Sequence, residues 1–420
     1  MNSNDRAIVG LVMVAHGLVH TYELSIPILV GIWLAELPVT PASIGTAVTV
    51  GTAFFGLGAL PAGVLADRYG SQRLIVVSLL GMGGSFVLLR AADGVVGIAA
   101  ALSLWGVAAS VYHPSGLSLI SKGVSRRGVA FAYHGMAGNL GIALGPLVTA
   151  LLLIAFDWRL VVVALAVPAG VGAAFALRVD VDEAAAVEAD GGRDADGSGA
   201  GDGDGRAGGV SSLGAFLAES RLLFTSAFAL VFVVLLLSGL YYRGVTTFLP
   251  DLFVSLPGLG SVELGRTTLE PSRFVYAGLL MVGMGGQYVG GKLTDRYPTE
   301  WGLAVGYGAL AVVAAVFLPV ANLGFVPMLV VAALLGFFLF VVQPFYQATV
   351  AEYSPPETRG LSYGFTYLGV FGIGALGAVL AGWLLTLYSP LVLFGVLAAI
   401  AGLASAVGFV LTRLASPAGA

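Results

Sequence analysis

Ionisable side chains inside long apolar runs are the residues of this sequence best suited to chemistry. His16, His20 and Glu23 follow one another at spacings of four and three residues, so a helix places them on one face. Such groups are costly in a bilayer unless they are paired or line a cavity, and they mark substrate and proton pathways. Loss of hydration favours the protonated form of a carboxylic acid, and histidine titrates near neutral pH. We therefore predict that Glu23 and His20 bind and release the protons that move along such a pathway.

Other polar groups in the apolar runs are candidates for the same pathway. His113 and His134 also lie in the first half of the chain. Ordinary polar packing between helices is the alternative interpretation of His16, His134 and Glu23. Arg243 follows two tyrosines, which indicates either a cationic contact toward the outer half of the pathway or a side chain that reaches the membrane surface. The second half offers neutral hydrogen-bonding groups suited to an amphipathic or weakly polar solute: Gln287, Gln343, Tyr346 and Gln347.

The composition predicts an integral membrane protein in which these groups are held by helices. Of 420 residues, 58% are hydrophobic and 10% are charged, whereas soluble domains have about 25% charged residues. A spanning helix needs about 20 apolar residues. Twelve stretches meet this need: 7–33, 43–65, 74–91, 95–120, 128–153, 159–177, 222–249, 272–293, 301–320, 325–350, 359–385 and 390–412.

An acidic segment divides the twelve stretches into two sets of six. Nine of the 23 acidic residues lie within 179–209, among glycine and alanine and without apolar periodicity. This composition predicts a disordered linker over 179–221. The expected domains are therefore an N-terminal bundle over 1–178 and a C-terminal bundle over 222–420.

Basic residues predict the orientation of the chain in the membrane. Fourteen of the 19 lysines and arginines flank the predicted helices on one side, and cytoplasmic loops are the ones enriched in these residues. We therefore expect the linker and both termini to lie on the cytoplasmic side of the plasma membrane.

A short charged turn between the second and third stretches recurs in the second half. It contains Gly63, Asp67, Arg68, Gly70 and Arg73, and its weaker copy contains Gly291, Asp295 and Arg296. Asp67 and Asp295 are 228 residues apart, and two further pairs of similar motifs are 230 and 232 residues apart. An internal repeat of six helices is typical of carriers that open alternately to the two sides of a membrane.

The spacing of this turn resembles the signature between helices 2 and 3 of the major facilitator superfamily, and the half copy and central loop match too. The resemblance covers essentially the whole chain and implies two six-helix bundles around a central cavity. It also implies that Asp67 faces the start of helix 11 and, by symmetry, that Asp295 faces the start of helix 5. We expect these contacts to latch the cytoplasmic side while the cavity faces outward. The alternative for Arg68 and Arg73 is that they only fix topology.

A glycine stripe on the fifth stretch contains Gly138, Gly141, Gly145 and Pro146. It lets another helix approach closely, which ordinary packing explains. It also partly resembles the antiporter signature of the superfamily, although Thr149 stands where that signature has a glycine. With His113 and Pro114, the stripe is similar to the fosmidomycin-resistance branch, which implies a proton-coupled drug exporter.

The sequence therefore predicts a secondary transporter that exports a small organic solute in exchange for protons and works as a monomer in the lipid bilayer. Uptake by proton or sodium symport is the alternative, and a metal-ion carrier using His16, His20 and Glu23 is a weaker one. We expect no resident metal or cofactor. An enzyme is not expected, because Gly17 stands where a zinc-protease helix needs glutamate. The acidic linker argues against nucleic acid as a partner.

Overall fold

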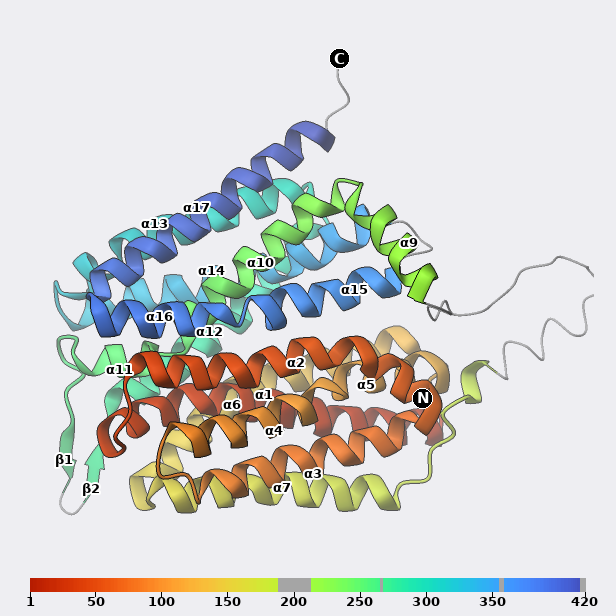
Figure 1. Cartoon of the computed structure of the whole chain (residues 1–420), viewed down its shortest axis with the longest axis horizontal. Helices are drawn as coiled ribbons and strands as arrows, with labels where there is room; N and C mark the ends of the chain where they lie inside the picture. The colour runs from red at the N-terminus through yellow and green to blue at the C-terminus, as the bar shows by residue number, and fades with distance from the viewer. Residues whose placement is uncertain (188–212, 265–266, 355–358, 416–420) are drawn as a thin grey trace, which may run out of the picture.

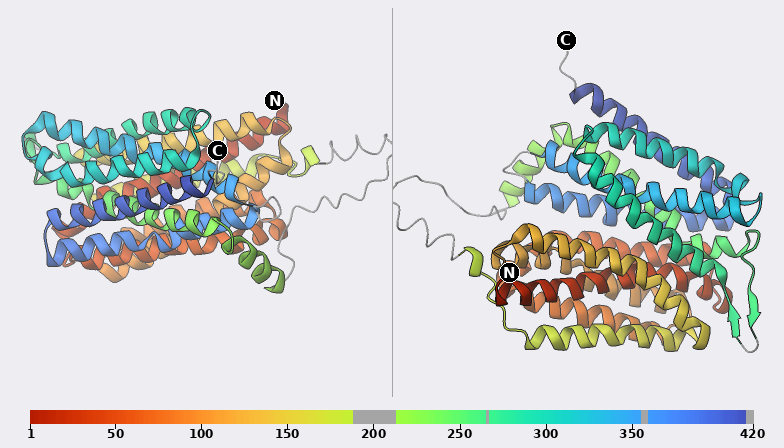
Figure 2. Two further views of the ribbon diagram at one scale, coloured as in Figure 1. Left: turned by 90° about the horizontal axis from the view of Figure 1, so that it is seen from above. Right: turned by 180° about the vertical axis from the view of Figure 1, so that it is seen from behind.

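Two bundles of roughly aligned helices lie against each other, one from each half of the chain (Figure 1). The computed structural model describes residues 1–187, 213–264, 267–354 and 359–415. The N-terminus lies at one end of the molecule, which we call the terminal end. A short hairpin of β1 (Val262–Leu264) and β2 (Thr267–Leu269) lies at the other, the hairpin end (Figures 1 and 2).

The helices of each bundle follow the predicted order. The N-terminal bundle contains α1 (Ser3–Glu36), α2 (Pro41–Tyr69), α3 (Ser71–Leu89), α4 (Val95–Ser110), α5 (Tyr112–Gly123), α6 (Arg127–Ala155) and α7 (Trp158–Arg178). The C-terminal half contains α9 (Leu213–Phe224), α10 (Phe228–Thr246), α11 (Leu249–Val254), α12 (Pro271–Thr294), α13 (Thr299–Ala321), α14 (Phe325–Tyr353), α15 (Arg359–Tyr367), the π-helix η2 (Leu368–Ile373), α16 (Leu376–Leu387) and α17 (Pro390–Ala415).

Eleven segments of the described residues are long and apolar enough to cross a membrane. Two of them combine shorter elements: Val95–Gly123 joins α4 and α5, and Leu361–Leu387 joins α15, η2 and α16. The remaining predicted stretch corresponds to α12, a 24-residue helix packed against α14 and α6. The predicted all-α membrane fold is therefore confirmed, and α12 is consistent with a twelfth span.

The fourth predicted stretch is broken at Val111, where one helix over 95–120 was expected. Val111 separates α4 from α5. Pro114 has no N–H to donate to the carbonyl of Ser110, and its ring crowds that carbonyl. The break therefore has a local cause, and it sets the direction of α5, which holds His113.

The predicted disordered linker, 179–221, lies mostly outside the described residues, but both of its ends are ordered. The carboxylate of Glu183 accepts hydrogen bonds from the backbone N–H groups of Ser71 and Gln72 at 2.8 and 2.9 Å. An anionic side chain at a helix N-terminus is stabilised by the exposed N–H groups there. At the other end α9 already begins at Leu213. The prediction was wrong at these ends, because composition does not reveal a helix cap.

The two bundles meet along a seam between α2 and the η2–α16 segment. The hydroxyl of Thr49 donates to the carbonyl of Ala375 at 2.9 Å and accepts from the N–H of Val379 at 3.0 Å. Gly56 lies so close to η2 that a Cβ there would stand 2.1 Å from the backbone nitrogen of Gly372. Small residues thus allow direct backbone contact between the bundles.

Candidate functional site

A buried ion pair joins the two bundles. Nη2 of Arg243, on α10, donates a hydrogen bond to Oε1 of Glu23, on α1. The two side chains have only 6% and 2% of their surface exposed. The guanidinium also lies over the rings of Tyr242 and Phe371, 5.5 Å from each centroid. Paired, hydrogen-bonded charges of this kind offset part of their desolvation cost. The pair links α1 of one bundle to α10 of the other.

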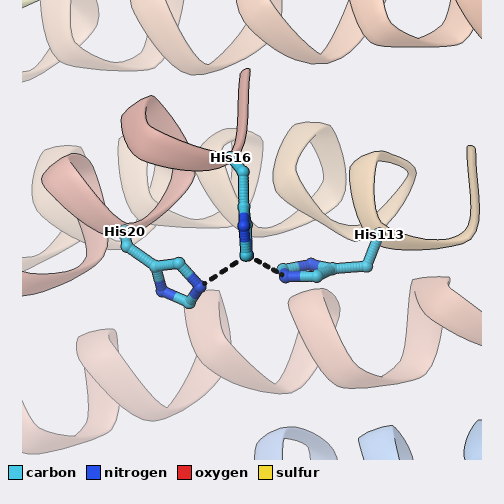
Figure 3. A group of neighbouring side chains, drawn as sticks. All are labelled: His16, His20 and His113. Atoms are coloured by element: carbon cyan, nitrogen blue, oxygen red, sulfur yellow. Dashed lines mark hydrogen bonds between the residues drawn. The ribbon is translucent and has the colours of Figure 1, made fainter. Parts of the chain in front are cut away.

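Three histidines extend this ion pair into the N-terminal bundle. Nδ1 of His20 lies 2.7 Å from Oε2 of Glu23, and its Nε2 lies 3.1 Å from Nε2 of His16. His113, on α5, brings its Nε2 to 3.3 Å from the same nitrogen of His16. Figure 3 shows the rings of His20 and His113 pointing toward His16 from two sides. The structure thus brings together five of the residues selected from the sequence: Arg243, Glu23, His20, His16 and His113.

His134, on α6, supports His16 through its backbone and its ring. Its carbonyl accepts a hydrogen bond from Nδ1 of His16 at 2.7 Å, and the two rings stack with centroids 3.8 Å apart. One turn further on, a Cβ on Gly138 would lie 2.4 Å from the His16 ring. Glycine at this position therefore leaves the space that His16 occupies.

The distances along this chain allow protons to pass between its members. The carbonyl of His134 only accepts, so Nδ1 of His16 bears a proton. The Nε2 atoms of His16 and His20 are within hydrogen-bonding distance of each other, and Nδ1 of His20 is within hydrogen-bonding distance of the carboxylate of Glu23. His20, which bonds at both ring nitrogens, therefore connects His16 to Glu23.

A cavity of about 70 Å³ lies beside the ion pair, room for a few water molecules. His20 and Glu23 line it from the N-terminal bundle, and Gln343 and Tyr346 line it from α14. Gln287 and Gln347, the other two candidates, are not among its lining residues. Residues that sequence reasoning missed complete the wall: Ile142, Ser238, Tyr241, Tyr242, Tyr307, Leu310, Leu339, Val342, Val370 and Phe371.

The structure adds to the sequence interpretations of Arg243 and Glu23. Arg243 does not reach the membrane surface, because its guanidinium is buried against Glu23. Desolvation alone would favour the protonated form of Glu23, but the expectation did not include this arginine. A neighbouring cation within hydrogen-bonding distance favours the ionised carboxylate. Glu23 therefore lies between Arg243 and His20, with one carboxylate oxygen bonded to each.

The charged turn at the terminal end has local contacts within the N-terminal bundle. Oδ1 of Asp67 lies 2.6 Å from Nζ of Lys122, at the end of α5. Both side chains are exposed, at 62% and 43%. Gly70 adopts φ +88° between α2 and α3, a conformation that a side chain would strain. Arg68 and Arg73 are exposed, as are Asp295 and Arg296 of the second copy, whereas Gly63 and Gly291 are half-buried with open space around them.

The latch hypothesis for Asp67 is testable through its observed partner. We expect Asp67→Asn to shift the carrier toward the state open at the terminal end, seen as longer spin-label distances between the ends of α2 and α15. Lys122→Gln is the matched control, because it removes the same exposed ion pair, worth at most about 1 kcal/mol, but keeps the carboxylate. An equal shift in both variants would attribute the effect to the Asp67–Lys122 pair and contradict the latch.

The glycine stripe packs inside the N-terminal bundle. A Cβ on Gly141 would stand 2.1 Å from the carbonyl oxygen of Gly17, and one on Gly145 would stand 2.6 Å from that of Thr21. Pro146 continues the buried face of α6. These contacts support the helix-packing interpretation of the stripe, which brings α6 close enough to α1 for His134 to bond His16.

Comparison with known proteins places this geometry in a family. A family model described as Major Facilitator Superfamily matches residues 10–375. The chain belongs to the Major Facilitator Superfamily. The fold of this superfamily is also seen in solved structures that are similar over nearly the whole chain. The nucleoside transporter NupG matches with a TM-score of 0.74 at 13% identity, covering 97% of this chain and 100% of that one. A bacterial homolog of the human lysosomal transporter Spinster matches with a TM-score of 0.75 at 13% identity, covering 98% of both.

Relatives with higher identity match over shorter regions. An uncharacterized MFS-type transporter of Mycobacterium tuberculosis is 35% identical over 105 residues, which is 25% of each chain. The puromycin resistance protein pur8 of Streptomyces alboniger is 35% identical over 115 residues, 27% of this chain and 23% of that protein. A probable actinorhodin transporter of Streptomyces coelicolor is 34% identical over 131 residues, 30% of this chain and 22% of that protein. The chain thus spans about a quarter of the length of the relatives it matches.

Proposed function

We propose that this superfamily transporter exports a small organic solute in exchange for protons. The observation that supports it best is the buried chain from Arg243 through Glu23 and His20 to His16, which crosses between the bundles beside the cavity. A proton-coupled carrier needs a group that binds a proton where the bundles must separate. Glu23 meets this need, because it is also one partner of the ion pair between α1 and α10.

The connection through His20 suggests how coupling works. When a proton passes from His20 to Glu23, the carboxylate becomes neutral and its attraction to Arg243 weakens. The bundles are then joined less firmly at this point, so α1 and α10 separate more easily. When the proton leaves, the anion re-forms and pairs with Arg243 again. Proton binding and bundle movement are thereby linked through one carboxylate.

The names of two relatives support the proposed direction of transport, and the cavity lining supports the proposed class of solute. Two of the relatives are named for puromycin resistance and for actinorhodin transport, names that suit efflux. The similarity to the fosmidomycin-resistance branch stays a prediction of the same kind. Tyrosines and Gln343 surround the cavity, with Glu23 and Arg243 already paired to each other. This lining suits an aromatic or amphipathic solute of low charge.

Inverted membrane vesicles test the direction of transport. We expect an acidic vesicle interior to drive solute accumulation inside the vesicles, because the interior corresponds to the outside of the cell. A symporter would instead move solute out of the vesicles under the same gradient. Solutes for the assay come from a resistance screen with the gene deleted and overexpressed. The assay assumes that the terminal end faces the cytoplasm of a plasma membrane, which reagents applied to labelled termini in intact cells check separately.

A further inference from the structure

We propose that His16, His20 and His113 form a binding site for one divalent transition-metal ion such as Zn²⁺. Each residue offers one ring nitrogen, and these nitrogens all lie within 4.8 Å of one another. Nε2 of His16 is 3.1 Å from that of His20 and 3.3 Å from that of His113. Zinc bound tetrahedrally at about 2.0–2.1 Å from its nitrogen ligands separates them by about 3.3 Å. Two of the three nitrogen pairs therefore already have the required spacing (Figure 3).

The groups around the three rings provide a second and independent argument. Histidines that bind a metal usually donate their other ring N–H to a carboxylate or a backbone carbonyl, which orients the ring. Nδ1 of His16 bonds the carbonyl of His134, and Nδ1 of His20 bonds the carboxylate of Glu23. Nδ1 of His113 is buried and has no hydrogen-bond partner among the described residues, so it is free to bear the proton when Nε2 binds a metal.

The surroundings also favour a borderline metal with an open fourth position. A neutral set of three imidazoles suits zinc, cobalt or copper better than calcium or magnesium, which prefer oxygen ligands. His20 lines the cavity, and 14% of its side chain is exposed, so an ion has a route to it and water has room to complete the coordination. Glu23 and Arg243 carry opposite charges and pair with each other beside the three histidines, so their combined effect on an incoming cation is small.

The site belongs to one bundle. All three ligands lie on α1 and α5, so a bound ion does not lock the two bundles together. Metal binding at this site therefore does not depend on the proposed proton coupling.

Cobalt binding tests the site without reference to transport. Protein purified without a histidine tag and freed of metal is titrated with Co²⁺, and the visible absorption of tetrahedral cobalt is recorded. We expect one ion per chain, displaced by Zn²⁺, and an affinity at least about tenfold lower in His113→Phe and in His20→Asn. Glu36→Gln is the matched control, because Glu36 lies on α1 with His16 and His20 but bonds Trp158 away from the cavity, and it should bind cobalt as the unaltered protein does.

Three results would overturn the proposal. They are absence of tetrahedral cobalt absorption, unchanged binding in His113→Phe and His20→Asn, and equal loss in the Glu36→Gln control. Failure of proton coupling itself would be recognised separately, by pH-driven transport that persists when Glu23 is replaced.

Discussion

Glu23→Gln is expected to abolish transport driven by a pH gradient while solute exchange across the membrane continues. Glutamine has the shape of glutamate, and its amide still accepts from Arg243 and donates to Nδ1 of His20. It cannot gain or lose a proton, so the chain of His16, His20 and position 23 no longer delivers one to the bundle interface. Reconstituted vesicles measure both activities on the same preparation, as pH-driven accumulation and as exchange of labelled for unlabelled solute.

Glu36→Gln supplies the control on the same helix. Glu36 lies at the hairpin end of α1 and accepts a hydrogen bond from Nε1 of Trp158 at 3.0 Å, away from the cavity. We expect this variant to retain pH-driven accumulation. Accumulation at the normal rate in Glu23→Gln would show that Glu23 packs helices but does not couple protons.

The same variant has a stability consequence that tests the ion pair directly. Glu23→Gln leaves the buried guanidinium of Arg243 without a counter-ion, and loss of one partner of a buried pair costs about 3–5 kcal/mol. The double variant Glu23→Gln/Arg243→Gln removes both charges and is expected to recover much of that loss. Thermal unfolding in detergent measures the difference. Equal unfolding temperatures for the unaltered protein, Glu23→Gln and the double variant would contradict an ion pair between the bundles.

Much of the fold is visible in the sequence because a bilayer imposes strong constraints. Every spanning segment must satisfy its own backbone, so long apolar runs predict helices with few exceptions. The exceptions are local and physical. Pro114 breaks the helix at Val111, and Glu183 caps α3 from within a segment whose composition indicates disorder. The first cause could have been recognised from the sequence, but the second requires knowing which helix end lies nearby.

The site was predictable along a helix but not between helices. Spacing alone places His16, His20 and Glu23 on one face, and their hydrogen bonds follow from that. Arg243 is 220 residues from Glu23, and no spacing rule relates the rotation of α10 to that of α1. Because the sequence does not show that Arg243 lies beside Glu23, the protonation of the carboxylate was predicted from loss of hydration alone. Tyr346 was selected from the sequence, but Tyr307 and the remaining cavity tyrosines were not, because tyrosine in an apolar run is also common in helix packing and at membrane interfaces.

Gly141→Ala is expected to have the largest effect of any single methyl group on this site. The added Cβ would stand 2.1 Å from the carbonyl oxygen of Gly17, and a backbone atom cannot turn aside as a side chain does. α1 and α6 must then move apart, and overpacking of this kind costs about 1–3 kcal/mol or more. Because His16 precedes Gly17, the same movement draws Nδ1 of His16 away from the carbonyl of His134. We expect a lower unfolding temperature together with weakened pH-driven transport.

Gly135→Ala provides the comparison within α6. A Cβ at Gly135 meets nothing within 4 Å, so this variant should unfold and transport normally. If Gly141→Ala had the same unfolding temperature and the same pH-driven transport as Gly135→Ala, α1 and α6 would not be held in backbone contact. Loss of transport at an unchanged unfolding temperature would instead indicate that the contact between α1 and α6 positions His16 but adds little to the stability of the bundle. This second result would separate the two roles proposed for the glycine stripe: it lets α6 approach α1, and it determines where the histidine chain begins.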